Sequence, residues 1–336
     1  MAEMNKNLVI TALMLIMSCL CLAHPPYGIV MDHAGNLYFA DIMHHGRGTL
    51  WKLDKNKKLT PLLKDFHAHN VNIDQAGNIY SAHGEETHTL IRINPAGDID
   101  TLIMETDENQ YFGGNAVVSN SGRIYFGINR KIWEWDNEKV DSINHEDLKW
   151  NQGFYVDQDE TIYATDIGRG QGGSLIKIMR DGSSKVIADQ LIDVGDREFD
   201  PYSEVLLGVK KDDSGNVYVC DLGGKRVARI DDDNKVESYY ESDEGWMPCG
   251  ITFKDDKSYV IEFQDGMERF RIVMNQGETK EVYYDFQDYS SQNRVDHVIP
   301  SGRTKWIIYC LVGVLFVFTI LMKKSKKARS VGLIFQ

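Results

Sequence analysis

The segment GIVMDHAGNLYFAD, which starts at Gly28, is the first of six copies of one short pattern in this chain. The other copies are NVNIDQAGNIYSAH from Asn70, NAVVSNSGRIYFGI from Asn115, GFYVDQDETIYATD from Gly153, GVKKDDSGNVYVCD from Gly208 and GITFKDDKSYVIEF from Gly250. They recur about every 44 residues, which is a spacing typical of propeller blades. Because a unit this short cannot bury its own apolar face, the copies must pack against one another.

Each copy predicts two β-strands joined by a polar turn and a second strand centred on a tyrosine. The turns contain residues that tolerate positive φ or bond their own backbone: Asp32 with Gly35-Asn36, Asp74 with Gly77-Asn78, and Asp213 with Gly215-Asn216. Two further strand-like segments follow in each unit, such as residues 50–53 and 59–63. We therefore predict an all-β chain that forms a six-bladed β-propeller with four-stranded blades. A β-sandwich, the competing fold, would not repeat this signature at a near-constant period.

Residues 8–23 form an apolar stretch that follows Lys6 and contains no charge. Its length is that of a signal-peptide core and is short for a membrane-spanning helix. We expect residues 1–23 to be a signal peptide cleaved after Ala23. An uncleaved signal anchor is the first alternative, and a lipoprotein signal ending at Cys19 is the second.

Residues 304–322 predict a single transmembrane helix. The stretch from Trp306 to Met322 is uncharged and would span about 25 Å as a helix. Five basic residues follow it: Lys323, Lys324, Lys326, Lys327 and Arg329. The positive-inside rule then places residues 323–336 in the cytoplasm as a basic tail, and the propeller of residues 24–286 outside it, beyond a linker of residues 287–303. We expect a single-pass protein of the cell membrane whose propeller is extracytoplasmic, either periplasmic or extracellular.

The formal net charge of the chain is −13. An acidic surface repels the phosphate backbone, so we expect no nucleic-acid partner. Cys220 and Cys249 are the two cysteines within the predicted propeller. They lie on strands of adjacent units, and either a disulfide between blades or two separately buried thiols fits this placement.

The six units resemble NHL repeats. Over about residues 25–286 the chain is also similar to the six-bladed superfamily that includes gluconolactonase of the senescence-marker-protein type, strictosidine synthase and paraoxonase. The resemblance implies the propeller fold. It implies no single activity, because the superfamily contains lactonases, lyases and non-catalytic binding modules.

Gluconolactonase-like enzymes hold one divalent metal in the channel with a Glu, two Asn and an Asp. The stretch GNAVVSNSGRIYFG is similar to their first Asn motif and implies Asn115 as a ligand, and WNQGFYVDQDETIYATD is similar to the second and implies Asn151. Two ligands have no counterpart: no Glu stands beside Tyr27, and Leu207 stands at the Asp position. Glu204 could replace that Asp only if the strand register shifted.

Polar residues also gather where the first strands of the second to fourth units begin. In a propeller these strands line the axial channel, so Asn70 and Gln152 are predicted ligand-binding residues. In His67-Ala68-His69, strand alternation sends both imidazoles to one face, and His83 could complete a three-histidine site for a transition metal. The NHL-type amidating lyase draws its zinc-binding histidines from several blades, whereas these lie in one unit. Hydrogen-bonded surface histidines are the alternative interpretation.

Three aspartates, Asp41, Asp166 and Asp221, end the second strand of their units. Because they recur at one repeat position, we expect them to cap the following turn rather than to form a site. The leading functional prediction is that the channel face binds a small ligand, a metal or a protein segment. The alternative is a divalent-metal-dependent hydrolase of the lactonase type, or a lyase. Either could use one divalent cation, calcium or zinc.

Overall fold

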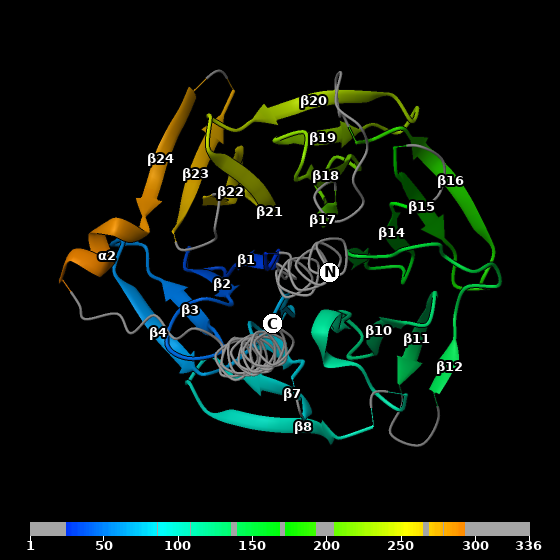
Figure 1. Ribbon diagram of the computed structural model, residues 1–336, viewed down its shortest axis with the longest axis horizontal. Helices are drawn as coiled ribbons and strands as arrows, with labels where there is room; N and C mark the ends of the chain where they lie inside the picture. The colour runs from blue at the N-terminus through cyan, green and yellow to red at the C-terminus, as the bar shows by residue number, and fades with distance from the viewer. Residues whose placement is uncertain are drawn as a thin grey trace, which may run out of the picture. The chain divides into compact units, whose positions relative to one another are not determined.

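The computed structural model describes residues 25–85, 87–107, 109–135, 140–168, 172–192, 205–264, 269–277 and 279–292. Within them the chain forms six separate four-stranded antiparallel sheets, which confirms the six-bladed β-propeller. Figure 1 shows the sheets following one another around a centre, with the orange β24 sheet beside the blue β1 sheet. No helix in the described part of the chain is both long and apolar enough to cross a bilayer. The predicted signal segment and transmembrane helix lie outside the described residues.

Each blade takes four consecutive strands, of which the first is innermost. The first three blades comprise β1 (Ile29–Met31), β2 (Leu37–Asp41), β3 (Thr49–Leu53) and β4 (Leu59–Lys64); β5 (Val71–Ile73), β6 (Ile79–His83), β7 (His88–Ile93) and β8 (Ile99–Glu105); and β9 (Val117–Val118), β10 (Ile124–Ile128), β11 (Lys131–Trp135) and β12 (Val140–Ser142). The last three comprise β13 (Phe154–Val156), β14 (Ile162–Asp166), β15 (Ser174–Ile178) and β16 (Ser184–Asp189); β17 (Leu206–Lys211), β18 (Val217–Asp221), β19 (Arg226–Ile230) and β20 (Val236–Glu241); and β21 (Trp246–Lys254), β22 (Lys257–Gln264), β23 (Phe270–Gln276) and β24 (Thr279–Asp285).

The innermost strands form a closed ring around the channel. β1 contacts β5, β5 contacts β9, and the series continues through β13, β17 and β21 back to β1. A short 3₁₀ helix, η1 (Gly113–Asn115), leads into β9. After β24, helix α2 (Phe286–Gln292) occupies the first residues of the predicted linker, and Phe286 packs on Trp51 of the first blade and Phe270 of the sixth. Apolar contacts therefore join the two ends of the ring.

The turn between the first and second strands is held by one repeated carboxylate network. In the first blade, Asp32 accepts hydrogen bonds from the Asn36 backbone at 2.8 Å and from the Tyr38 hydroxyl at 3.1 Å. Asp74 does the same in the second blade. In the fifth blade the carboxylate belongs to Asp212, not to the predicted Asp213. The prediction was wrong by one residue because two adjacent aspartates offer the same chemistry, and only the strand register selects between them.

Glycines that lie in or just before four innermost strands let neighbouring blades approach backbone to backbone. A Cβ on Gly250 would lie 2.0 Å from the carbonyl oxygen of Tyr27, and one on Gly153 would lie 2.0 Å from that of Leu207. A Cβ on Gly28 would lie 2.1 Å from the Val71 backbone nitrogen, and one on Gly208 would lie 2.6 Å from the Cys249 carbonyl oxygen. Any side chain at these positions would push two blades apart, since nothing flexible can move aside.

We predict that Gly250→Ala lowers the free energy of unfolding by about 3 kcal/mol or more, because its methyl group meets a backbone carbonyl. Gly245→Ala is the control: Gly245 has φ 80° and no atom within 4 Å of an added Cβ. That change should cost only about 1 kcal/mol, from the left-handed backbone. Urea unfolding of both variants measures the difference, and equal losses would contradict the close approach.

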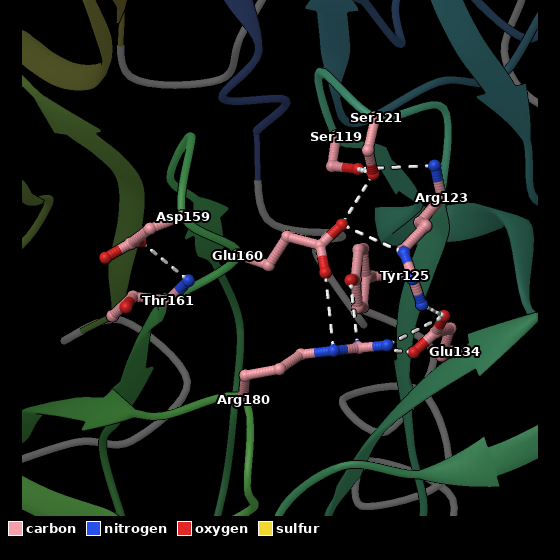
Figure 2. A network of polar contacts seen from close by, with 9 residues as sticks. All are labelled: Ser119, Ser121, Arg123, Tyr125, Glu134, Asp159, Glu160, Thr161 and Arg180. Atoms are coloured by element: carbon pink, nitrogen blue, oxygen red, sulfur yellow. Dashed lines mark hydrogen bonds and ion pairs between the residues drawn. The ribbon is translucent and has the colours of Figure 1, made fainter.

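The junction between the third and fourth blades is ionic (Figure 2). Ser119 replaces the turn aspartate in the third blade, and Arg123 follows it. Glu134 accepts hydrogen bonds from Arg123 at 2.6 Å and from Arg180 of the fourth blade at 2.5 Å. Glu160 of the fourth blade lies 3.0 Å from the Arg123 Nε. The network thus links the two blades where the usual turn carboxylate is missing.

The pKa of Glu134 is lowered: burial alone raises it, but hydrogen bonds from Arg180 and Arg123 outweigh that effect. The stabilisation is therefore present above the unfolded pKa, near 4.3, and is lost as pH falls through the lower folded pKa. Glu134→Gln should lower Tm at pH 7 by about 2–4 °C, and this deficit should shrink as acid protonates Glu134 in the unchanged protein. Glu237→Gln, at the more exposed pair with Arg229, is the control and should change Tm less. A deficit in Glu134→Gln that does not shrink on acidification would contradict this role.

Candidate functional site

His67 and His69 meet at one end of the channel, before strand β5. Their Nε2 atoms are 3.0 Å apart. Two nitrogens bound to one tetrahedral zinc ion at 2.0–2.1 Å would lie about 3.3 Å apart, so the pair is close to that separation. The Nδ1 of His67 is 3.1 Å from the Arg47 carbonyl oxygen, which fixes the orientation of its ring.

His83 does not join this pair as a third ligand. Its Nδ1 accepts a hydrogen bond from the His67 backbone N–H at 2.8 Å, and its ring packs on Phe66. Burial, followed by the positive charges of Arg47 and His67, lowers the pKa of His83 and favours the neutral acceptor form. His83 therefore positions the backbone of His67 in this structure.

Asn115 and Asn151 converge from adjacent blades above Gly127. The Asn115 Nδ2 and the Asn151 Oδ1 each lie 3.0 Å from the point that a Gly127 Cβ would occupy. The Asn115 Oδ1 accepts the Gly127 N–H at 3.0 Å, and the Asn151 Nδ2 donates to the carbonyls of Gly153 and Thr165. The Asn151 Oδ1 is buried and has no hydrogen-bond partner among the described residues. A donor and an unsatisfied acceptor therefore face the same point.

The other predicted site residues differ in their placement. The Asn70 Nδ2 reaches the Ala116 carbonyl oxygen at 3.5 Å and so connects the second blade to the third. Gln152 is half-buried between Asn151 and Gly153. Glu204 lies outside the described residues. The sequence pattern did not single out Asn72, although it lines the channel and donates to the Ala116 oxygen at 3.2 Å.

The aspartates at the ends of second strands cap turns, as predicted. Asp41 accepts the backbone N–H groups of Met43 and His44 at 2.7 and 2.8 Å. Asp166 accepts that of Gly168 in the following turn, and also those of Lys149 and Trp150, and Asp221 accepts that of Gly224. All three carboxylates are fully buried, so they are structural. Cys220 and Cys249 are buried free thiols, and burial raises the pKa of each.

The residues present do not fit a gluconolactonase-type metal site. The described residues contain no group of three or more His, Cys, Asp or Glu side chains that could hold a metal ion. No Glu stands beside Tyr27, and Leu207 stands at the Asp position; both of these residues are buried. Hard divalent cations need carboxylate oxygens in most protein sites, and the two asparagines alone do not supply them.

These features define a six-bladed propeller. We call the polar surface formed by His67, His69, Asn115 and Asn151 the channel mouth; it lies on the second to fourth blades only. No family model matches the sequence, and no curated protein matches it. The fold is similar to that of virginiamycin B lyase from Staphylococcus aureus, with a TM-score of 0.51 and 14% identity over 77% of this chain and 84% of that one. It is similar to a gluconolactonase from Xanthomonas campestris, with a TM-score of 0.53 and 14% identity over 72% and 84%. It is also similar to regucalcin, a calcium-binding protein from Agrobacterium tumefaciens, with a TM-score of 0.52 and 15% identity over 79% and 92%. At these identities the likeness establishes the fold.

Gly127→Ala should block the point that Asn115 and Asn151 face, because its methyl group would lie 3.0 Å from both amides. Only side-chain atoms must move, so we expect the free energy of unfolding to change by less than about 1 kcal/mol. Urea unfolding together with amide NMR shifts of Asn115 and Asn151 measures both effects. Unfolding at much lower urea, or unshifted side-chain amide resonances, would contradict the placement of these side chains.

Proposed function

We propose that this chain is a membrane-anchored, extracytoplasmic propeller of the NHL and gluconolactonase-like type that binds a ligand at its channel mouth. One observation carries the proposal: the buried Asn151 Oδ1 has no hydrogen-bond partner among the described residues, and it lies 3.0 Å from the same point above Gly127 as the Asn115 Nδ2 does. An unsatisfied buried acceptor costs about 1–3 kcal/mol, so a bound donor would stabilise the folded chain. A hydroxyl group or a peptide amide both donates and accepts, and it matches this pair.

The ligand class follows from the same geometry. The pair is neutral, so a small molecule with several hydroxyl groups or a protein segment with a free backbone amide suits it better than an ion. His67 and His69 extend the polar surface onto the second blade. Asn70, which follows His69, donates to the carbonyl oxygen of Ala116, the residue after Asn115, and so connects the histidines to the asparagine pair.

The location is part of the proposal and rests on the sequence. The uncharged stretch from Trp306 to Met322 and the basic residues after it support a C-terminal anchor, with the propeller outside the cytoplasm. Residues 1–23 support export as a signal peptide or signal anchor. The acidic net charge of −13 disfavours a nucleic-acid partner.

A divalent-metal-dependent hydrolase of the lactonase type, or a lyase, is the second candidate. It is favoured by the convergence of Asn115 and Asn151, the two residues that the gluconolactonase resemblance implies as ligands. The structural neighbours include a gluconolactonase and a virginiamycin B lyase. The absence of carboxylates from the described part of this site weighs against it.

The two candidates separate in one experiment on the full-length chain, purified without chelator or His-tag. Bound metal is measured by elemental mass spectrometry, and Tm and turnover are measured with the neutral D-glucono-1,5-lactone as the probe. Binding without catalysis predicts a concentration-dependent rise in Tm with this probe, no enzymatic turnover, and loss of the rise in Asn151→Ala. Asn78→Ala, in a turn at the other end of the strands, is the control and should keep the rise.

Near-stoichiometric calcium that is lost in Asn115→Ala, together with lactone hydrolysis, would establish the hydrolase instead. Zinc that is lost in His69→Ala would assign the metal to the histidine pair. A rise in Tm that survives both Asn151→Ala and Gly127→Ala would show that the probe binds elsewhere, and the channel-mouth proposal would fail.

A further inference from the structure

The innermost strands enclose an axial cavity of about 150 Å³. A water molecule occupies about 30 Å³ of liquid volume, so the cavity has room for a molecule of several heavy atoms. The residues that line it include Tyr27, Asn72, Tyr155 and Lys210. Lys210 supplies the only formal charge among the described residues that line it.

Lys210 lines this cavity and is half-buried, and its ammonium group forms no ion pair with any described residue. Among the described residues its Nζ has one recorded contact, the face of the Tyr155 ring at 5.0 Å. Burial lowers the pKa of Lys210, with Asp157 and Asp213 acting in the opposite direction. Asp157 is already bound to Lys211 at 2.6 Å, and Asp213 is exposed. The charge of Lys210 is therefore only partly compensated by the protein.

A second polar group of the cavity wall lacks a partner. Tyr27 is 4% exposed, and its hydroxyl makes no hydrogen bond to any described residue. Burial raises the pKa of both Tyr27 and Tyr155, so their hydroxyls stay protonated as donors. The wall thus combines one cation with hydroxyl donors, which is the chemistry that binds an anion.

We propose that the axial cavity binds one small monocarboxylate, with the Lys210 ammonium as its counter-ion and the tyrosines of the wall around it. This inference goes beyond the proposed channel-mouth site. Lys210 lies two residues further along β17 than Gly208, and neither asparagine of the mouth belongs to the cavity wall.

The charge balance selects a monovalent anion. One ammonium neutralises one carboxylate, whereas a phosphate would bury a second negative charge without a partner. The acidic side chains of Asp157 and Asp213 near the lysine would oppose that extra charge. A carboxylate also accepts hydrogen bonds at both oxygens, which chloride cannot do with the same geometry.

The test uses the full-length chain with sodium acetate as the probe, at constant ionic strength set with sodium chloride. Isothermal titration calorimetry should show one acetate per chain. Lys210→Met keeps most of the side-chain volume and should weaken acetate binding at least about tenfold, because it removes a charge-assisted hydrogen bond. Lys52→Met is the matched control, since Lys52 also lies over a tyrosine ring, that of Tyr38 at 5.5 Å, but not in the cavity. Lys52→Met should bind acetate with the same affinity as the unchanged protein.

A second measurement on the unchanged protein keeps the proposal testable if Lys210→Met does not fold. In ¹³Cε-lysine NMR, acetate should raise the pKa of Lys210, because a bound anion stabilises the ammonium form. The pKa of Lys52 should not move. Asn151→Ala should leave this response intact, which separates it from the channel-mouth site. Acetate binding that is equal in Lys210→Met, or a Lys210 pKa that acetate leaves unchanged, would overturn the proposal, as would an equal response to inorganic phosphate.

Discussion

The structure depends on the direct approach of one blade's backbone to the next at the channel. Four of the six junctions achieve it with a glycine in or just before the innermost strand: Gly28, Gly153, Gly208 and Gly250. The other two positions hold Asn70 and Asn115, whose side chains make hydrogen bonds there instead. The polar mouth therefore lies where glycine does not close the ring, on the second to fourth blades. Ring closure and site position follow from the same constraint.

The turn between the first and second strands is stabilised by different contacts in different blades. Three blades use a local network of aspartate, asparagine and tyrosine within one hairpin. The third blade has Ser119 at the aspartate position, and its tyrosine hydroxyl accepts from Arg180 of the fourth blade at 3.2 Å. The hairpin network stabilises one blade, whereas the arginine and glutamate network joins two. The stability of the junction of the third and fourth blades should therefore depend on pH.

The fold could be predicted from the sequence because its signals are local: strand alternation, turn residues and a tyrosine at a fixed repeat position. The candidate site was less accessible. Sequence spacing brought His67 and His69 together correctly, yet it could not show that His83 would bond the His67 backbone. The choice of Asp212 over Asp213 needed the strand register. Lys210 was missed because a basic residue on a short strand resembles a solvated one, and only the closed ring makes its neighbourhood a cavity.

The buried polar groups of the propeller fall into two kinds. Asp41, Asp166 and Asp221 are fully buried and accept backbone N–H groups, so their burial is compensated. Along the channel, the buried Asn151 oxygen and the half-buried Lys210 ammonium have no such partner among the described residues. Unpartnered hydroxyls also occur elsewhere in the described part of the chain, as at Tyr111, but an unpaired hydroxyl costs less than a charge removed from water. A ligand that donates a hydrogen bond to the Asn151 oxygen, or an anion beside the Lys210 ammonium, would supply the missing partner.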